Sequence, residues 1–139
     1  MSFEILCALD LEKSWAAVIQ EMLKREGYKV LLCRNCADEI FDIDLDQFNL
    51  LIIDPVMTGS RSDARSGGLP VGIHAARCLR ENGCRVPIMA FADVGRKAFE
   101  ELLDAGVDTV VDLKCYPETV NKYVLSAVER LIKIGWALR

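Results

Sequence analysis

The stretch "LLIIDP", residues 50–55, decides the fold that this sequence predicts. Four apolar residues, 50–53, end abruptly at a carboxylate, Asp54, which a proline follows. A continuous apolar run of this length is typical of a strand that is buried on both faces of a parallel sheet. Ligand sites in such sheets lie beyond the carboxyl ends of the strands. Asp54 is therefore a candidate functional residue, and the structural alternative is an acid that caps a turn at the strand end.

Strands and helices alternate on both sides of this stretch. Short apolar runs predict strands at residues 5–9, 28–33, 50–54, 86–91 and 109–113. Helical spacing of apolar residues predicts helices at residues 15–23, 35–43, 71–82, 96–105 and 117–132. Gly27 and Gly106 supply helix stops, and Pro70 and Pro117 lie at helix starts.

This alternation predicts an α/β fold, a doubly wound five-stranded parallel sheet in a three-layer sandwich, because each right-handed crossover must carry the chain over one face of the sheet. A single domain is expected over residues 1–139. Residues 58–70, "TGSRSDARSGGLP", form a long predicted loop directly after the strand of Asp54, and loops of this length are commonly functional or disordered. Residues 135–139 are expected to be a C-terminal tail that begins a linker to an effector domain.

Composition excludes several function classes. The net charge is −4 and no run of basic residues exceeds two, which argues against nucleic-acid binding by this domain. No apolar stretch is long enough to cross a bilayer, and no basic region precedes an apolar one at the N-terminus, so neither membrane association nor export is expected. The six cysteines are scattered through strand and helix patterns, which is typical of reduced thiols in the cytoplasm.

A second acid, Asp10, follows the first predicted strand. Since the carboxyl ends of parallel strands meet at one edge of the sheet, Asp10 and Asp54 are expected to lie close together there. Two neighbouring carboxylates repel each other and raise the pKa of one of them unless a cation lies between them. Asp10 taken alone is also a good helix N-cap, and that alternative stays open.

Four segments together resemble a known family. They are "EILCALD" (4–10), "FNLLIIDPVMTG" (48–59), "VPIMAFAD" (86–93) and "LLDAGVDTVVDLK" (102–114). The pattern resembles the receiver domain of two-component response regulators, the CheY-like phosphoacceptor module with a flavodoxin-like fold. The resemblance covers nearly the whole chain.

The resemblance implies a phosphoacceptor and a metal site. The phosphoacceptor aspartate falls on Asp54, and the metal-binding acid on Asp10. Mg²⁺ would be held by Asp10, Asp54 and the backbone carbonyl of Val56, which are hard oxygen ligands suited to a hard cation. Such a cation is needed because a carboxylate that attacks a phosphoryl group meets a strongly negative electrophile.

Three positions depart from the family pattern. Leu9 stands where the first of two consecutive acids is usual, and Ala92 stands where the family has a switch Ser or Thr. The lysine that pairs with the phosphoryl group falls by counting on Leu113, with Lys114 one residue later. A one-residue slip turns a strand side chain to the other face, so either a bulge brings Lys114 back, which we favour, or the site has no lysine.

Two further acids lie at the expected rim of the site. Asp93 follows Ala92 directly, and Asp112 lies near the end of the fifth strand. Asp93 would act either as a water-mediated metal ligand or as a charge that repels phosphate, and both alternatives stay open.

The leading hypothesis is a receiver domain that accepts a phosphoryl group on Asp54 from a sensor histidine kinase in a phosphorelay. It would be a signalling switch, self-phosphorylating from a phosphodonor at most, rather than an enzyme. By resemblance, its output surface would be the fourth helix, fifth strand and fifth helix, which would dimerise or contact an effector domain. The alternative is a pseudo-receiver, a protein-interaction module with little or no phosphorylation. A flavodoxin-like cofactor binder ranks last, because "DLEKSW" (10–15) after the first strand has no glycine for a phosphate loop.

The remaining metal-ligating residue types have simpler interpretations. "CRNC" (33–36) has the spacing of a redox pair or half a zinc site, but a second pair is missing and packing is expected. His74, the single histidine, is expected at the surface early in the third crossover helix, and Cys78, Cys84 and Cys115 show no obvious common geometry in the sequence.

Overall fold

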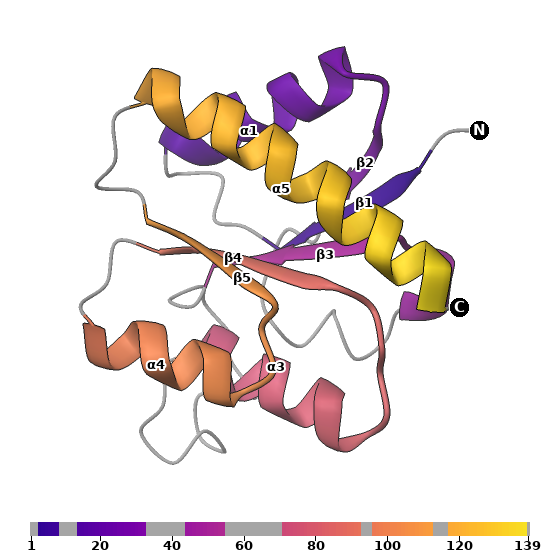
Figure 1. Ribbon diagram of the computed structural model, residues 1–139, viewed down its shortest axis with the longest axis vertical. Coiled ribbons are helices and arrows are strands. Elements are labelled where there is room, and N and C mark those ends of the chain that lie inside the picture. Colours follow the sequence, from indigo (N-terminus) through magenta and orange to yellow (C-terminus); the bar gives the residue numbers. More distant parts are fainter. Residues whose placement is uncertain are drawn as a thin grey trace.

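Five parallel strands form one sheet in the order β2-β1-β3-β4-β5 (Figure 1). The computed structural model describes residues 3–8, 14–32, 44–54, 71–92, 96–112 and 117–138. The strands are β1 (Glu4–Ala8), β2 (Lys29–Leu32), β3 (Leu50–Ile53), β4 (Ile88–Ala92) and β5 (Thr109–Asp112). Their register pairs Ala8 with Ile53 and Ala92 with Asp112, so the carboxyl ends of neighbouring strands meet at one edge.

Helices cover both faces of this sheet, as Figure 1 shows. On one face lie α1 (Ser14–Arg25) and α5 (Pro117–Leu138), and on the other lie α3 (Val71–Glu81) and α4 (Arg96–Asp104). Alternate residues of each strand enter two separate cores: Cys7 and Ile52 pack with α1 and α5, whereas Leu6 and Leu51 pack with α3 and α4. The apolar run 50–53 is buried because both of its faces are covered by helices.

The chain reverses its winding direction between β1 and β3. From β1 the chain moves outward to β2, and from β3 it moves the other way through β4 to β5. This strand order is that of the flavodoxin-like doubly wound fold, whose ligand crevice lies at the carboxyl ends of the two central strands. The predicted fold class is confirmed.

The observed elements differ from the predicted ones mainly at their ends. The helix α5 continues to Leu138, through most of residues 135–139 that were expected to form a tail. A short 3-10 helix, η1 (Leu45–Gln47), was not predicted; its N-cap Asp44 accepts a hydrogen bond from the backbone N–H of Asp46 at 3.1 Å. The predicted helix at 35–43 and the predicted loop at 58–70 lie outside the described residues. Within the described part of the chain, no helix combines the length and the apolar character needed to span a bilayer.

A group of polar contacts closes the amino edge of the sheet, opposite the carboxyl edge. The guanidinium of Arg80, in the last turn of α3, donates to the backbone carbonyls of Cys84 (2.9 Å), Val86 (2.8 Å) and Gly106 (2.9 Å). It also forms a 2.9 Å ion pair with Asp108. We call these groups the Arg80 clamp. The clamp ties the end of α3 to the segments that lead into β4 and β5.

Candidate functional site

Asp54 is the centre of the candidate site. It follows the last residue of β3, and its backbone N–H donates to the carbonyl of Ala8 at 3.1 Å, so the end of β3 is fastened to the end of β1. Asp54 is only 1% exposed, and among the described residues it is the one polar or charged residue that is buried. A carboxylate is seldom buried unless it is paired or coordinates a metal, which makes Asp54 a candidate functional residue.

The neighbouring strand ends define the rim around Asp54. On one side β1 ends at Ala8, and on the other β4 continues to Ala92, whose type carries no hydroxyl group. Beyond β4, the edge strand β5 ends at Asp112, which is exposed. Asp112 therefore lies at the solvent side of the rim, whereas Asp54 lies inside it.

Three of the four predicted site residues lie outside the described residues. They are Asp10, Val56 and Lys114, and so are Leu9 and Asp93. Of the expected magnesium ligands the structure places only Asp54. Within the described ranges, no three or more His, Cys, Asp or Glu side chains come close enough together to hold a metal ion.

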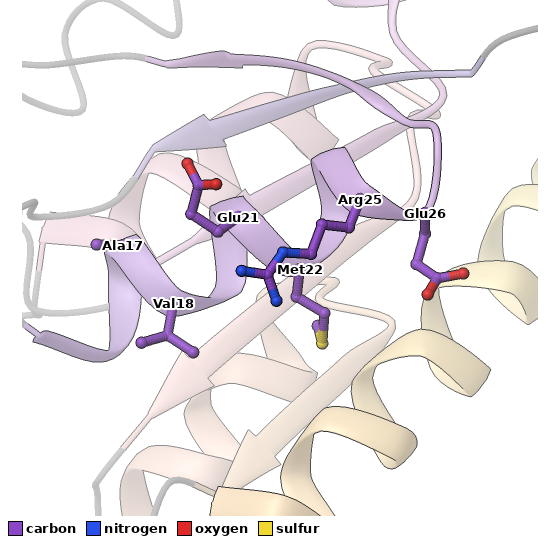
Figure 2. A pocket seen from close by; sticks show the side chains of 6 residues that line it. All are labelled: Ala17, Val18, Glu21, Met22, Arg25 and Glu26. Carbon is purple, nitrogen blue, oxygen red and sulfur yellow. The ribbon is translucent and has the colours of Figure 1, made fainter.

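Two surface hollows lie away from this rim. One, of about 440 Å³, lies along the outer side of α1, and all six lining residues come from α1 and the turn that follows it (Figure 2). Its apolar part is formed by Ala17, Met22 and Val18, of which Val18 is 56% exposed. The other, of about 460 Å³, lies at the amino edge and is lined by parts of the Arg80 clamp together with Leu131 and Ile134 of α5. Neither hollow includes Asp54.

The sequence interpretation missed two side-chain pairs that the structure reveals. Arg80 and Asp108 are 28 residues apart and no local pattern connects them. His74 and Cys78 of α3 lie in contact, with the Cys78 Sγ 3.5 Å from the His74 Nε2. Their four-residue spacing on one helix was the signal that could have found this second pair.

Comparisons with known proteins support the fold. No family model and no curated protein matches the chain. Among solved structures, the chain is similar to the signal receiver domain of a signal transduction histidine kinase from Syntrophus aciditrophicus (20% identity, TM-score 0.71, 95% of this chain and 91% of that chain). It is also similar to the receiver domain of a sensor histidine kinase from Pseudomonas aeruginosa, solved with magnesium coordinated in its active-site cleft (24% identity, TM-score 0.70, 96% and 99%).

A third similar structure is the receiver domain of a response regulator from Francisella (19% identity, TM-score 0.73, 95% and 98%). The alignments span almost the full length of both chains in each case. At these low identities the likeness concerns the backbone arrangement. The chain therefore has the fold of CheY-like receiver domains.

Proposed function

We propose that this chain acts in the cytoplasm as a receiver domain of a two-component phosphorelay, accepting a phosphoryl group on Asp54 from a phosphohistidine of a sensor histidine kinase. The observation that carries the proposal is the burial of the Asp54 carboxylate at the point where chain winding reverses. Burying a carboxylate costs free energy unless it is paired or coordinates a cation, and the ligand crevice of this fold lies at the same point.

The proposed cation is Mg²⁺, held by Asp10, Asp54 and the backbone carbonyl of Val56. Asp10 comes two residues after Ala8, so covalent geometry keeps its Cα within about 7 Å of the Ala8 Cα. Val56 is likewise two residues from Asp54. Two carboxylates and a carbonyl are hard oxygen donors that fit magnesium. Leu9 stands where the family has a further acid next to the one at Asp10, so the binding of magnesium should be weaker here.

The proposed chemistry is a single displacement at phosphorus. A carboxylate oxygen of Asp54 forms the new P–O bond while the P–N bond to the kinase imidazole breaks, and the imidazole leaves with its electron pair. The cation would neutralise charge on the equatorial oxygens and on the two carboxylates during this step. Lys114, two residues after the end of β5, is proposed to pair with the transferred group, which requires a bulge after Asp112.

The proposed output surface consists of α4, β5 and α5. Among the described residues, four large apolar side chains of these elements are exposed: Phe99 (40% exposed), Leu103 (44%), Tyr123 (49%) and Ile134 (51%). Phe99 and Leu103 are four residues apart on α4, so they share one face of that helix. Exposed aromatic and aliphatic groups are suited to a homodimer or to contact with an effector domain.

The second candidate is a pseudo-receiver that binds a partner protein with little or no phosphorylation. Three departures favour it: β4 ends at Ala92, which has no hydroxyl to hydrogen-bond a phosphoryl oxygen, Leu9 stands where a metal-binding acid is usual, and Lys114 lies one residue beyond the position of the family's lysine. The two candidates share the fold and differ only in the reactivity of Asp54.

A phosphodonor assay tests the proposal. The protein is incubated with acetyl phosphate and Mg²⁺, and its intact mass is measured. We expect an adduct of one phosphoryl group, about 80 Da, that is absent without Mg²⁺ and absent in Asp54→Asn. Asp10→Asn should slow its formation at limiting Mg²⁺.

Asp112→Asn is the matched control, since it removes an exposed acid at the same edge of the sheet and should leave the adduct unchanged. A folded protein that forms no adduct with acetyl phosphate or phosphoramidate would establish the pseudo-receiver instead. An adduct that persists in Asp54→Asn would refute the assignment of the phosphoacceptor.

A further inference from the structure

A histidine and a cysteine lie side by side on the outer side of α3. His74 and Cys78 are both half-buried, whereas Ile73, Ala76 and Leu79 of the same helix face the core. The Cys78 Sγ lies 3.5 Å from Nε2 and 3.9 Å from Nδ1 of the His74 ring. Residues four apart share one face of a helix, so the backbone itself holds this pair together.

The separation of the two ligand atoms matches a tetrahedral metal site. With Zn–S and Zn–N bonds of about 2.3 Å and 2.05 Å, a tetrahedral angle places the sulfur and nitrogen about 3.5 Å apart. The Sγ–Nε2 distance in the structure is 3.5 Å. No large movement of α3 is therefore required for both atoms to reach one ion.

The contact is not a well-formed hydrogen bond. The sulfur lies at nearly the same distance from both ring nitrogens, so neither nitrogen lone pair points straight at it. Binding an ion together with Sγ would therefore require the imidazole ring of His74 to turn about its second side-chain torsion, which is broad for imidazole rings.

Charges near the pair act in both directions. Burial raises the pKa of the Cys78 thiol, Glu81 raises it further and Arg77 lowers it. Glu81 lies three residues after Cys78 on α3 and brings a negative charge to this part of the helix, whereas Arg77 brings a positive one. A metal ion that binds here displaces the thiol proton, as metal ions commonly do at cysteine ligands.

We propose that His74 and Cys78 form a binding site for Zn²⁺ or a similar borderline transition-metal ion, with water in the remaining coordination positions. Imidazole and thiolate ligands select such ions over Mg²⁺, which the acids at the carboxyl edge would take. With two protein ligands the site has open positions, so the ion should exchange readily. The site is independent of the proposed phosphorylation of Asp54, and either can fail without the other.

Cobalt is a spectroscopic probe for this site. The full chain, reduced and freed of metal with a chelator, is titrated with Co²⁺, which shows a thiolate-to-metal charge-transfer band in the near ultraviolet when cysteine coordinates it. We expect one ion per chain and loss of the band when Zn²⁺ is added. Cys78→Ser should abolish the band, and His74→Ala should weaken Co²⁺ binding about tenfold or more.

Two control variants distinguish this site from the other thiols. Cys84→Ser removes a half-buried cysteine elsewhere in the chain and should leave the band unchanged. The Cys33→Ser/Cys36→Ser double variant removes the CRNC pair and should also leave it unchanged. Circular dichroism shows whether each variant is folded. The proposal is overturned if the wild type binds no Co²⁺ with a thiolate band, if the band survives in folded Cys78→Ser, or if it disappears with Cys33 and Cys36.

Discussion

The Arg80 guanidinium lies 2.9 Å from the carboxylate of Asp108, across 28 residues of sequence. The same Asp108 oxygen accepts a hydrogen bond from the backbone N–H of Ile88 at 2.8 Å. One carboxylate oxygen therefore joins the last turn of α3, the first residue of β4 and the turn before β5. These contacts hold the amino edge of the sheet, at the far end of the strands from Asp54.

Replacing Arg80 should destabilise the protein. Arg80→Met keeps much of the aliphatic stem but leaves the carbonyls of Cys84, Val86 and Gly106 without their guanidinium donor. We expect the free energy of unfolding to fall by about 2–3 kcal/mol, because partly buried acceptors lose their partners. Urea denaturation followed by circular dichroism measures the change.

Arg85→Met is the control for this prediction. Arg85 is exposed and lies near the clamp, and its replacement should change the free energy of unfolding by less than about 0.5 kcal/mol. Arg80→Lys should recover only part of the loss, since an ammonium group cannot reproduce the planar fork of a guanidinium. Equal stabilities of Arg80→Met and Arg85→Met would show that the clamp contributes nothing.

Alanine variants of two glycines distinguish the cost of backbone strain from the cost of a clash with the Arg80 clamp. Gly83 and Gly106 both follow helices with positive φ, at 84° and 98°. A Cβ on Gly83 would meet nothing within 4 Å, whereas one on Gly106 would lie 2.5 Å from the Arg80 Cγ. Arg80 cannot move aside freely, because four hydrogen bonds hold its tip.

Gly83→Ala should therefore lower the free energy of unfolding by about 1–2 kcal/mol through left-handed strain alone. Gly106→Ala should lower it further by at least about 1 kcal/mol, which is the expected size of an overpacking effect. The midpoints of thermal or urea unfolding compare the two variants. If Gly106→Ala is as stable as Gly83→Ala or more stable, Arg80 does not pack closely against Gly106.

Replacing Gly135 with alanine should destabilise the protein, contrary to the usual preference of helices for alanine over glycine. It lies within α5, where alanine is normally more favourable than glycine by about 1 kcal/mol. A Cβ at this position would lie 2.7 Å from the Cγ of Pro87, whose ring is buried and stiff. We expect Gly135→Ala to destabilise the protein by about 1–3 kcal/mol. Ser126→Ala, at an exposed position of the same helix, should instead stabilise the protein by about 0.3–0.5 kcal/mol.

The Cys78 thiol should react slowly with alkylating reagents in a chelator-treated sample. Burial is the main cause of its raised pKa, followed by Glu81, and only the thiolate is nucleophilic. Glu81→Gln removes a charge that raises the pKa, so alkylation of Cys78 at pH 8 should become roughly twofold faster. Arg77→Ala removes a charge that lowers the pKa and should slow the reaction. Peptide mass mapping follows Cys78 alone, and identical rates in the two variants would count against this electrostatic account.

The parts of the fold that could be predicted are those that depend on residues close together in the sequence. The run at 50–53, the stops at Gly27 and Gly106 and the helix start at Pro117 each depend on a few neighbouring residues. The end of α5 was predicted too early, because Gly135 was interpreted as part of a tail. In the structure the absent side chain of Gly135 allows α5 to pack closely against Pro87, and the helix continues.

By itself, the sequence determined the fold class, the order of the five strands and of α1, α3, α4 and α5 along the chain, and the position of Asp54 after the third strand, since apolar periodicity and glycine or proline signals act over only a few residues. Only the tertiary structure decided that Asp54 is buried against the end of β1, that Arg80 reaches Asp108, and that the Cys78 Sγ lies 3.5 Å from His74. Such relationships depend on how helices pack on the sheet and on which rotamers that packing permits, and these are set jointly by residues far apart in the chain.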